Sequence, residues 1–241
     1  MNMSTSRLYA PVAPGTHPAN TTDAYRSSAK RAPREALVVI PETLSEVSGP
    51  RCGRERLGHA GHDLTRPAGA RGGEALGQRI IVHGRLLDER GRPERGALVE
   101  VWQANAAGRY LHDGDRHDAP LDPNFTGRGA VLTDDEGRYR FLTIEPGIYP
   151  WANHYNAWRP KHIHFSLFGQ AWATRLVTQM YFPGDPTLPL DPIFMGVPDE
   201  AARARLVSRF DIASTEPDYA MAYEFDIVLR GADGTPWEGR P

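Results

Sequence analysis

From residue 79 onward the chain consists of short runs in which β-branched and aromatic residues alternate with polar ones. Each run is bounded by Gly, Pro, Asn or Asp, a pattern that is typical of strands joined by turns. We therefore expect strands in six segments, at residues 79–88, 96–104, 129–144, 162–169, 176–184 and 222–231.

Two segments between these runs have the composition of hairpin turns, "DERGRP" at 88–93 and "TDDEGRY" at 133–139. Gly91 and Gly137 can supply the positive φ that tight turns need. Turns at this spacing favour a sheet of antiparallel strands.

One helix is predicted over residues 198–210. A proline stands at its start, acidic residues fill its first turn, and Leu206 and Phe210 fall on one face. Together these elements predict a mostly β fold, an antiparallel β-sandwich with long decorated loops and one or two short helices.

Residues 1–78 differ in character, because they are rich in Pro, Gly, Ser and Arg and have weak periodicity. The stretch "SSAKRAPREALVVI" suggests a short helical turn and then an extended piece that ends at Pro41. So long an irregular stretch favours a binding, lid or interface role, with a disordered tail as the alternative. We expect residues 1–78 to be an arm that packs on a partner subunit, and residues 79–241 to be the catalytic domain.

Composition excludes several function classes. A content of 40% hydrophobic and 24% charged residues is ordinary for a globular protein. The net charge of −2 lacks the excess of positive charge that binding to nucleic acid or an anionic membrane requires. Cys52 is the single cysteine, so neither an intrachain disulfide nor a thiolate cluster is possible. No apolar run reaches membrane-spanning length, and the first residues carry no apolar leader, so a cytoplasmic location is expected.

The segment "WRPKHIHF" at 158–165 carries the first candidate chemistry. On a strand, His162 and His164 would lie on one face roughly 6.5–7 Å apart, and Ile163 and Phe165 would point into the apolar layer. That spacing suits two ligands of one metal, but histidines on exposed strands are common. The usual zinc and calcium motifs, a serine-hydrolase elbow and a phosphate-binding glycine loop are absent from the sequence.

Two tyrosines stand in turn contexts, Tyr110 in "NAAGRYLH" and Tyr149 in "EPGIYPW". A tyrosine beside glycine and proline is more often a packing residue whose hydroxyl finds a carbonyl. Neither residue alone identifies a metal site.

Six motifs in order carry a family resemblance. They resemble the intradiol ring-cleaving dioxygenases, and more narrowly the iron-bearing β subunits of protocatechuate 3,4-dioxygenases. The resemblance runs from about His17 to residue 231, and its motifs are "LVEVWQANAAGRY", "LDPNFTGRG", "PGIYPW", "WRPKHIHF", "TQMYFPGDP" and "FDIVLRG".

This resemblance implies one non-heme Fe(III) per chain, with Tyr110, Tyr149, His162 and His164 as ligands. Phenolates are hard anionic donors that suit Fe(III), whereas two histidines and a carboxylate suit Fe(II). The implied reaction uses O₂ to cleave 3,4-dihydroxybenzoate between its two hydroxyl-bearing carbons, which gives 3-carboxy-cis,cis-muconate. Tyr149 would leave the metal when the catechol binds and would help to take up its protons.

The resemblance also implies two further catalytic residues. Arg159 matches the family's arginine beside the substrate ring, where a fixed cation would stabilise developing negative charge. Gln179 matches a glutamine near the site and is a candidate donor to a substrate oxygen. The alternatives are a surface salt bridge for Arg159 and simple inter-sheet hydrogen bonding for Gln179.

Substrate-binding positions follow in the same way at Tyr25, Trp151, Ile193 and Arg159. The sequence departs from the family pattern around this pocket, so the preferred 4-substituent of the catechol stays open, and 4-sulfocatechol is an alternative substrate. The departures are His154, Tyr155, Phe168, Trp172, Asp191 and Phe194.

In this family a related α chain without iron ligands completes the enzyme, so we expect a hetero-oligomer of αβ units. Two rival functions remain. The pattern "GRLLDERGRPERGALVEVW" also resembles non-catalytic transthyretin-like β-sandwiches, and two histidines with an acid could serve a metal hydrolase.

Overall fold

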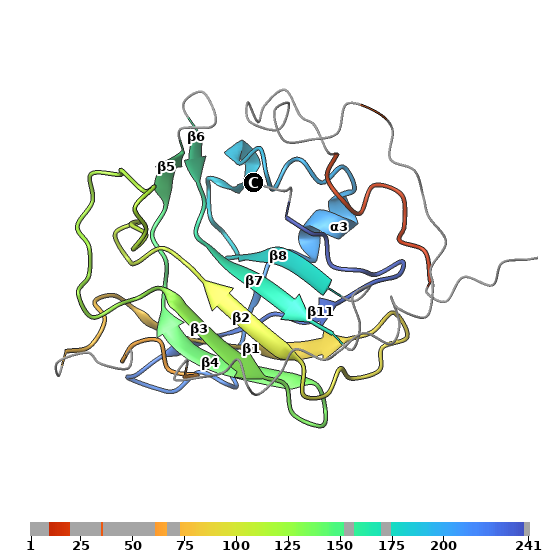
Figure 1. Cartoon of the computed structure of the whole chain (residues 1–241), viewed down its shortest axis with the longest axis horizontal. Helices are drawn as coiled ribbons and strands as arrows, with labels where there is room; N and C mark the ends of the chain where they lie inside the picture. Colours follow the sequence, from red (N-terminus) through yellow and green to blue (C-terminus); the bar gives the residue numbers. More distant parts are fainter. Residues whose placement is uncertain are drawn as a thin grey trace, which may run out of the picture.

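The computed structural model describes residues 10–19, 35, 61–66, 73–151, 157–169 and 175–238. Within these residues the secondary structure is mostly β, with one α-helix and one 3-10 helix (Figure 1). The predicted mostly β fold is therefore confirmed. The same part of the chain contains no helix that is long and apolar enough to cross a membrane.

The larger sheet is built around β1 (Arg79–Leu87). On one edge β1 pairs antiparallel with β4 (Arg138–Ile144). On the other edge it pairs with β10 (Met221–Glu224) and β11 (Ile227–Val228) in one continuous register, and both pairings are parallel rather than antiparallel as expected. β9 (Arg209–Phe210) pairs antiparallel with β10.

The smaller sheet has the order β3-β2-β7-β8, and all its pairings are antiparallel. Its strands are β2 (Leu98–Trp102), β3 (Arg128–Leu132), β7 (His162–Phe168) and β8 (Arg175–Tyr181).

Side chains from both sheets meet in one buried cluster, which makes the fold a sandwich. Ile80 of β1 and Phe141 of β4 contribute from the larger sheet, and Ile163 and Phe165 of β7 contribute from the smaller one. The strand alternation predicted for β7 is therefore confirmed, because Ile163 and Phe165 point into the core and His162 and His164 lie on the opposite face.

The two predicted turns are present, with Gly91 at φ 74° and Gly137 at φ 72°. They are not hairpins within one sheet, however. The first leads from β1 to β2 and the second from β3 to β4, so each carries the chain from one sheet to the other. Local turn composition fixes the reversal of the chain but not the sheet that the next strand joins.

The predicted helix over 198–210 is wrong in length. Helix α3 (Glu200–Ala204) is capped by the Asp199 side chain, which accepts from the Ala202 amide. The chain then turns because the backbone of Tyr181 bonds to Leu206 and Ser208 and draws it alongside β8. Phe210 consequently lies in β9 and is exposed.

A third, two-stranded sheet was not predicted. β5 (Tyr149–Trp151) pairs antiparallel with β6 (Ala157–Arg159) and lies next to the end of the smaller sheet where β7 begins (Figure 1). Its strands are too short for an alternating pattern to reveal them. A 3-10 helix, η3 (Leu188–Leu190), follows β8.

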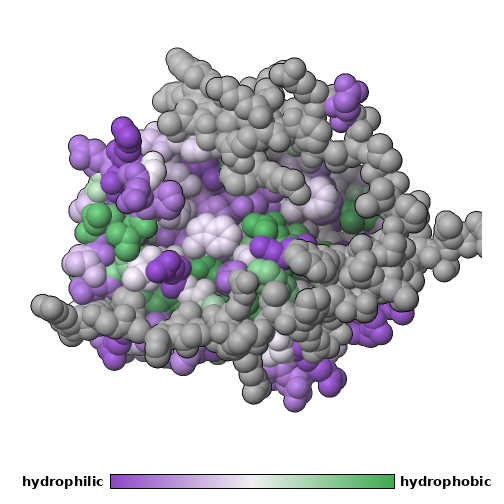
Figure 2. Space-filling view, in the orientation of Figure 1, coloured by the Kyte–Doolittle hydropathy of each residue, from purple (hydrophilic) through white to green (hydrophobic). Residues whose placement is uncertain are grey.

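The face visible in Figure 2 carries hydrophilic side chains interrupted by several separate hydrophobic patches. Most of residues 1–78 lie outside the described part of the chain, including residues 20–34, residues 36–41 and Cys52. The division into an arm over 1–78 and a domain over 79–241 therefore stays a prediction.

Candidate metal centre

The structure brings the four candidate ligands together at one end of the sandwich. The rings of Tyr110 and Tyr149 lie 5.4 Å apart, those of Tyr149 and His162 5.6 Å, and those of His162 and His164 4.8 Å. A distance of 6.4 Å between Tyr110 and His164 closes the circuit. Residues separated by more than fifty positions in the sequence thus form one cluster.

Strand pairing fixes both histidines. His164 lies between Trp102 of β2 and Gln179 of β8, and its ring stacks on Trp102 at 4.7 Å with an interplanar angle of 5°. His162 is paired with Tyr181 and is buried. Neighbours on both sides leave the His164 imidazole little freedom to rotate.

Two glycines allow the tyrosine-bearing loops to approach each other. Gly108 has φ 78°, and a Cβ at this position would lie 2.2 Å from the Ile148 carbonyl oxygen. A Cβ at Gly147 would lie 2.4 Å from the Ala106 carbonyl oxygen. This close backbone contact holds Tyr110 against Tyr149.

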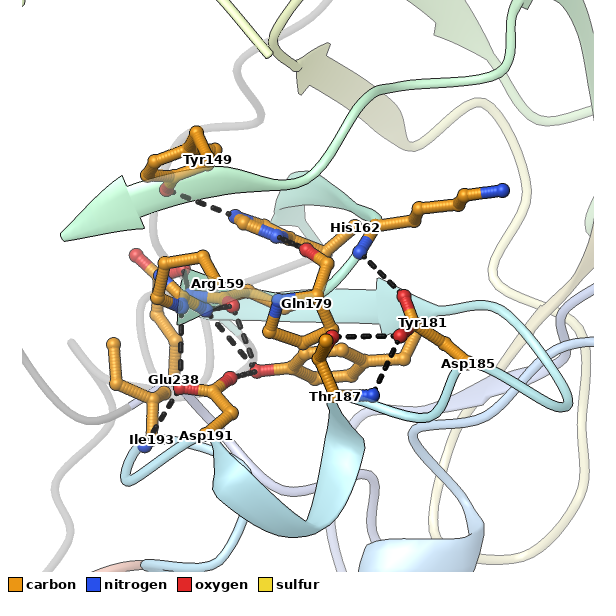
Figure 3. A network of polar contacts seen from close by, with 12 residues as sticks. Tyr149, Arg159, His162, Gln179, Tyr181, Asp185, Thr187, Asp191, Ile193 and Glu238 are labelled. Atoms are coloured by element: carbon orange, nitrogen blue, oxygen red, sulfur yellow. Dashed lines mark hydrogen bonds and ion pairs between the residues drawn. The ribbon is translucent and has the colours of Figure 1, made fainter. Parts of the chain in front are cut away.

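Each histidine uses its Nδ1 atom for a contact inside the protein. His162 Nδ1 lies 2.6 Å from the carbonyl oxygen of Pro160, and His164 Nδ1 lies 2.8 Å from Glu238 Oε2. Since a carbonyl and a carboxylate are acceptors, these contacts place the Nδ1 proton on each imidazole. The Nε2 lone pairs are then available to a metal, and His162 Nε2 lies 3.4 Å from the Tyr149 hydroxyl (Figure 3).

The Tyr110 hydroxyl is buried and has no hydrogen bond of normal geometry to any residue that the structure describes. Burial raises the pKa of Tyr110 well above its usual value. The nearby Tyr149 phenol is a second, smaller cause of the rise. A buried hydroxyl without a partner is costly unless something else binds it. A cation bound by the tyrosine oxygen would remove that cost.

Burial is also the largest cause of the pKa shifts of Tyr149 and His162. It raises the pKa of Tyr149, although the positive charge of Arg159 opposes the rise. It lowers the pKa of His162 well below the usual range, and Arg159 and His164 lower it further. The site thus favours a neutral imidazole at His162, and a bound cation is needed to make both phenols phenolates.

Arg159 is buried, with 3% of its side chain exposed, so the surface salt-bridge alternative is wrong. Its Nε atom lies 3.1 Å from Asp191 Oδ1. The two groups form an ion pair, but the geometry at Nε is not that of a hydrogen bond. Its Nη2 atom donates to Gln179 Oε1 and, at 3.3 Å, to the Tyr181 hydroxyl (Figure 3). β5–β6 pairing sets Arg159 directly across from Tyr149.

Sequence reasoning missed three members of this network. Asp191 was noted only as a departure from the family pattern, and Tyr181 was given no role, yet both contact Arg159. Glu238 received no role, because it lies in a tail without periodicity or motif. Gln179 bonds to Arg159 and Tyr181 through its oxygen and to Glu238 through its nitrogen.

The proposed pocket positions have different outcomes. Trp151 is half-buried, and the Arg159 guanidinium lies over its ring at 5.6 Å. Ile193 is half-buried, and its amide donates to Asp191 Oδ1 (Figure 3). Tyr25 lies outside the described residues, so its place at the pocket stays a prediction.

The departures from the family pattern are also placed in part. Phe168 lies under the Arg175 guanidinium at 4.1 Å, and Phe194 packs edge-on against Tyr181 at 5.0 Å. His154, Tyr155 and Trp172 lie outside the described residues.

The donor set fits a hard trivalent cation. In the described part of the chain no group of three or more His, Cys, Asp or Glu side chains could hold a metal. The candidate centre instead offers two phenol oxygens and two imidazole nitrogens. Two anionic oxygens and two nitrogens suit Fe(III) rather than Zn²⁺ or Ca²⁺.

Comparison with known proteins assigns the family. The model of the family described as "Dioxygenase" matches residues 47–231, and the model of the protocatechuate 3,4-dioxygenase beta subunit N terminus matches residues 10–43. The protocatechuate 3,4-dioxygenase beta chain of Burkholderia cepacia is 62% identical over 92% of this chain and 94% of its own length. The alpha chain from Pseudomonas putida is 28% identical over 83% of this chain and 96% of its own length.

Among solved structures, catechol 1,2-dioxygenase from Pseudomonas arvilla C-1 matches with a TM-score of 0.51 and 26% identity. The match covers 74% of this chain and 60% of that chain. These relatives are enzymes, which argues against the transthyretin-like binding module. The chain therefore belongs to the intradiol ring-cleaving dioxygenases, in the group of protocatechuate 3,4-dioxygenase beta subunits.

Proposed function

We propose that this chain is the iron-bearing β subunit of an enzyme that uses O₂ to cleave 3,4-dihydroxybenzoate between its two hydroxyl-bearing carbons. The product is 3-carboxy-cis,cis-muconate. One observation carries the proposal: two phenols and two imidazoles form a closed cluster in which the buried Tyr110 hydroxyl has no hydrogen bond of normal geometry to any described residue.

Tyr110, Tyr149, His162 and His164 would hold the iron. When bound, Fe(III) supplies a Lewis acid that draws electron density from a chelated catechol. The protein supplies the donor set in a fixed arrangement, because strand pairing holds the histidines and the Gly108–Gly147 contact holds the tyrosines.

Tyr149 would serve as the base that takes up a catechol proton, as the family resemblance implies. It lies on the short strand β5 and is half-buried. Burial raises the pKa of its phenol, against the opposing charge of Arg159, so the phenolate oxygen holds a proton once it has taken one from a catechol hydroxyl.

Arg159 provides a fixed positive charge beside Tyr149. Burial lowers the pKa of its guanidinium, but Asp191 and the neighbouring phenols outweigh this effect and raise it, so the group stays charged. A preorganised cation of this kind stabilises negative charge that develops on the substrate in the transition state.

The same proposal includes a partner and a substrate. The match to both an alpha and a beta chain of protocatechuate 3,4-dioxygenases supports an α subunit that completes the enzyme. The 62% identity to a beta chain supports 3,4-dihydroxybenzoate over 4-sulfocatechol.

The test is oxygen uptake by this chain co-expressed with the α chain from the same genome, supplied with catechol, 3,4-dihydroxybenzoate and 4-sulfocatechol. We expect 3,4-dihydroxybenzoate to give the highest kcat/KM, and ¹⁸O₂ to place one labelled atom in each of the two carboxylates that ring opening creates. A product cleaved beside, rather than between, the hydroxyl-bearing carbons would refute the intradiol assignment. A preference for 4-sulfocatechol would refute the substrate.

A further inference from the structure

We propose that Glu238 is a positioning residue that links the metal ligand His164 to the Gln179–Arg159 pair through a single carboxylate oxygen. This inference rests on the proposed function, since it assigns His164 to the metal. It extends that function by giving the segment after β11 a specific role in the site.

Both contacts of Glu238 use the same atom. Oε2 lies 2.8 Å from His164 Nδ1. The same oxygen accepts a hydrogen bond of 2.8 Å from Gln179 Nε2 (Figure 3). The Glu238 side chain is only 7% exposed, so water competes weakly for this oxygen. His164 and Gln179 are cross-strand neighbours in β7 and β8, which places their side chains side by side for one acceptor.

The contact with His164 selects the imidazole tautomer. An acceptor at Nδ1 keeps the proton on that atom, and the Nε2 lone pair is then directed away from Glu238. A carboxylate in this position also orients the ring and makes its free nitrogen a better donor. Trp102 stacks on the ring and restricts rotation about the remaining axis.

The contact with Gln179 selects the orientation of its amide. With Nε2 held by Glu238, Oε1 faces the opposite side, where it accepts from Arg159 Nη2 and from the Tyr181 hydroxyl at 2.8 Å. A flipped amide would present two donors to the guanidinium and lose these bonds. Glu238 therefore also determines how Arg159 is held.

Glu238 itself is fixed by the backbone of its segment. Its amide donates to the Val177 carbonyl at 2.9 Å, and the Pro236 carbonyl accepts from the Thr178 hydroxyl at 2.6 Å. The segment thus lies along β8, the strand that carries Gln179. On the other side, the ring of Trp237 stacks on His17 at 3.5 Å.

The first test needs no metal. In metal-free wild-type protein at about pH 8, above the usual titration range of imidazole, ¹⁵N–¹H correlation spectra through the His164 ring should show the Nδ1–H tautomer. Glu238→Ala should convert His164 to a mixture of tautomers, and Glu238→Gln, whose side-chain oxygen can accept both bonds, should largely retain the Nδ1–H form. His162 is the internal control, because Pro160 holds its tautomer independently of Glu238.

The second test uses the iron-loaded αβ enzyme. We expect Glu238→Ala to lose iron to a chelator about 10- to 100-fold faster than wild type and to shift the visible absorption, and Glu238→Gln to recover most of both. In a double-mutant cycle, kcat losses of Glu238→Ala and Gln179→Ala should be less than additive, because both disturb the same arginine contact. Glu216→Gln, which alters an exposed ion pair with Arg140, is the matched control and should match wild type.

The outcomes separate this inference from the proposed function. Wild-type protein that binds no iron would refute the proposed function, whereas the tautomer experiment would still report on Glu238. Iron-loaded wild-type enzyme together with a Glu238→Ala variant of unchanged tautomer, iron retention and absorption would refute the role of Glu238. If Glu238→Ala lost only thermal stability and Glu238→Gln failed to restore the spectra, the residue would be structural and the inference would be wrong.

Discussion

At the scale of single residues, the site depends on buried polar groups that satisfy one another. Arg159 and Asp191 are both almost fully buried, and such a pair is stable only while each charge keeps its partners. The arginine contacts Gln179 and Tyr181 as well, so three side chains hold one guanidinium beside Tyr149.

Replacing Arg159 with alanine should separate metal binding from turnover. None of the four proposed ligands is removed, so Arg159→Ala should retain iron and its colour, while kcat falls by about 10²–10³-fold, the usual cost of removing one preorganised charge-stabilising group. Metal analysis and steady-state oxygen uptake check the two parts. An unchanged kcat would show that the charge of Arg159 does not act on the reaction.

Replacing Asp191 tests the buried ion pair. Asp191→Ala should lower the free energy of unfolding by about 3–5 kcal/mol, because Arg159 would remain buried without its counter-charge. Urea titration of the metal-free chain gives this value. Asp191→Ala/Arg159→Met should recover part of the loss, and a double variant as unstable as the single one would contradict the explanation.

At the scale of elements, the sequence predicted strands far better than it predicted where they go. The six expected strand segments all contain strands, because alternation of apolar and polar residues reports local burial. The parallel pairing of β10 and β11 with β1 was missed, since register between distant strands has no local signal. Helix α3 ended early because a tertiary contact with Tyr181 outweighed helix propensity.

In the candidate site, too, the sequence predicted local geometry but not the contacts between distant segments. His162 and His164 could be placed on one face from strand geometry, but Tyr110 and Tyr149 were assigned only through family resemblance. Their contact depends on two loops whose approach requires Gly108 and Gly147. Glu238 and Asp191 enter the site from segments that have no periodic pattern, so no rule applied to the sequence alone would have selected them.

The loop contact can be tested with two glycines of equal conformation. Gly108 and Gly91 have φ 78° and 74°, but a Cβ at Gly108 would lie 2.2 Å from a carbonyl oxygen, whereas nothing lies within 4 Å of one at Gly91. Gly91→Ala should lower the free energy of unfolding by about 1–2 kcal/mol, the cost of a left-handed alanine. Gly108→Ala should add about 1–3 kcal/mol for the clash and should also reduce iron binding.

Urea titration and iron analysis of both variants distinguish strain from displacement of Tyr110. Equal destabilisation of the two variants, with iron binding intact in both, would show that the close approach of the loops does not position the tyrosine.

At the scale of the whole molecule, the first described segment and the segment after β11 meet. His17 stacks on Trp237 with an interplanar angle of 2°, and the Trp237 amide donates to His17 Nδ1 at 3.2 Å. Asp199, which caps α3, donates its amide to the Gly15 carbonyl. Figure 1 shows the red N-terminal segment close to α3. Residues 10–19 therefore brace the segment that carries Glu238.

This contact predicts a pH dependence. Burial, and then the positive charge of Arg205, lowers the pKa of His17 to about 4. Because the pKa in the folded state lies below the usual value near 6.5, the contribution of His17 to stability is complete above that value. It is lost as the pH falls from about 6.5 through 4. Protonation would also remove the acceptor for the Trp237 amide.

His17→Phe is the matched variant, since it keeps an aromatic ring but cannot titrate. Between about pH 6.5 and pH 4, the free energy of unfolding of wild type should fall more steeply than that of the variant, as measured by urea titration at several pH values. Parallel curves would mean that His17 titrates alike in the folded and unfolded chain.

The central claim, that two phenolate oxygens and two imidazole nitrogens bind one ferric ion, is tested most directly by iron analysis together with the visible spectrum of purified protein. We expect on the order of one iron per chain and a broad phenolate-to-iron absorption. Tyr110→Phe and Tyr149→Phe should each weaken and shift this absorption. Tyr219→Phe, which alters a tyrosine outside the cluster of candidate ligands, should leave the absorption unchanged. Active protein without iron, or an absorption that survives both ligand substitutions, would show that these four side chains do not bind a ferric ion.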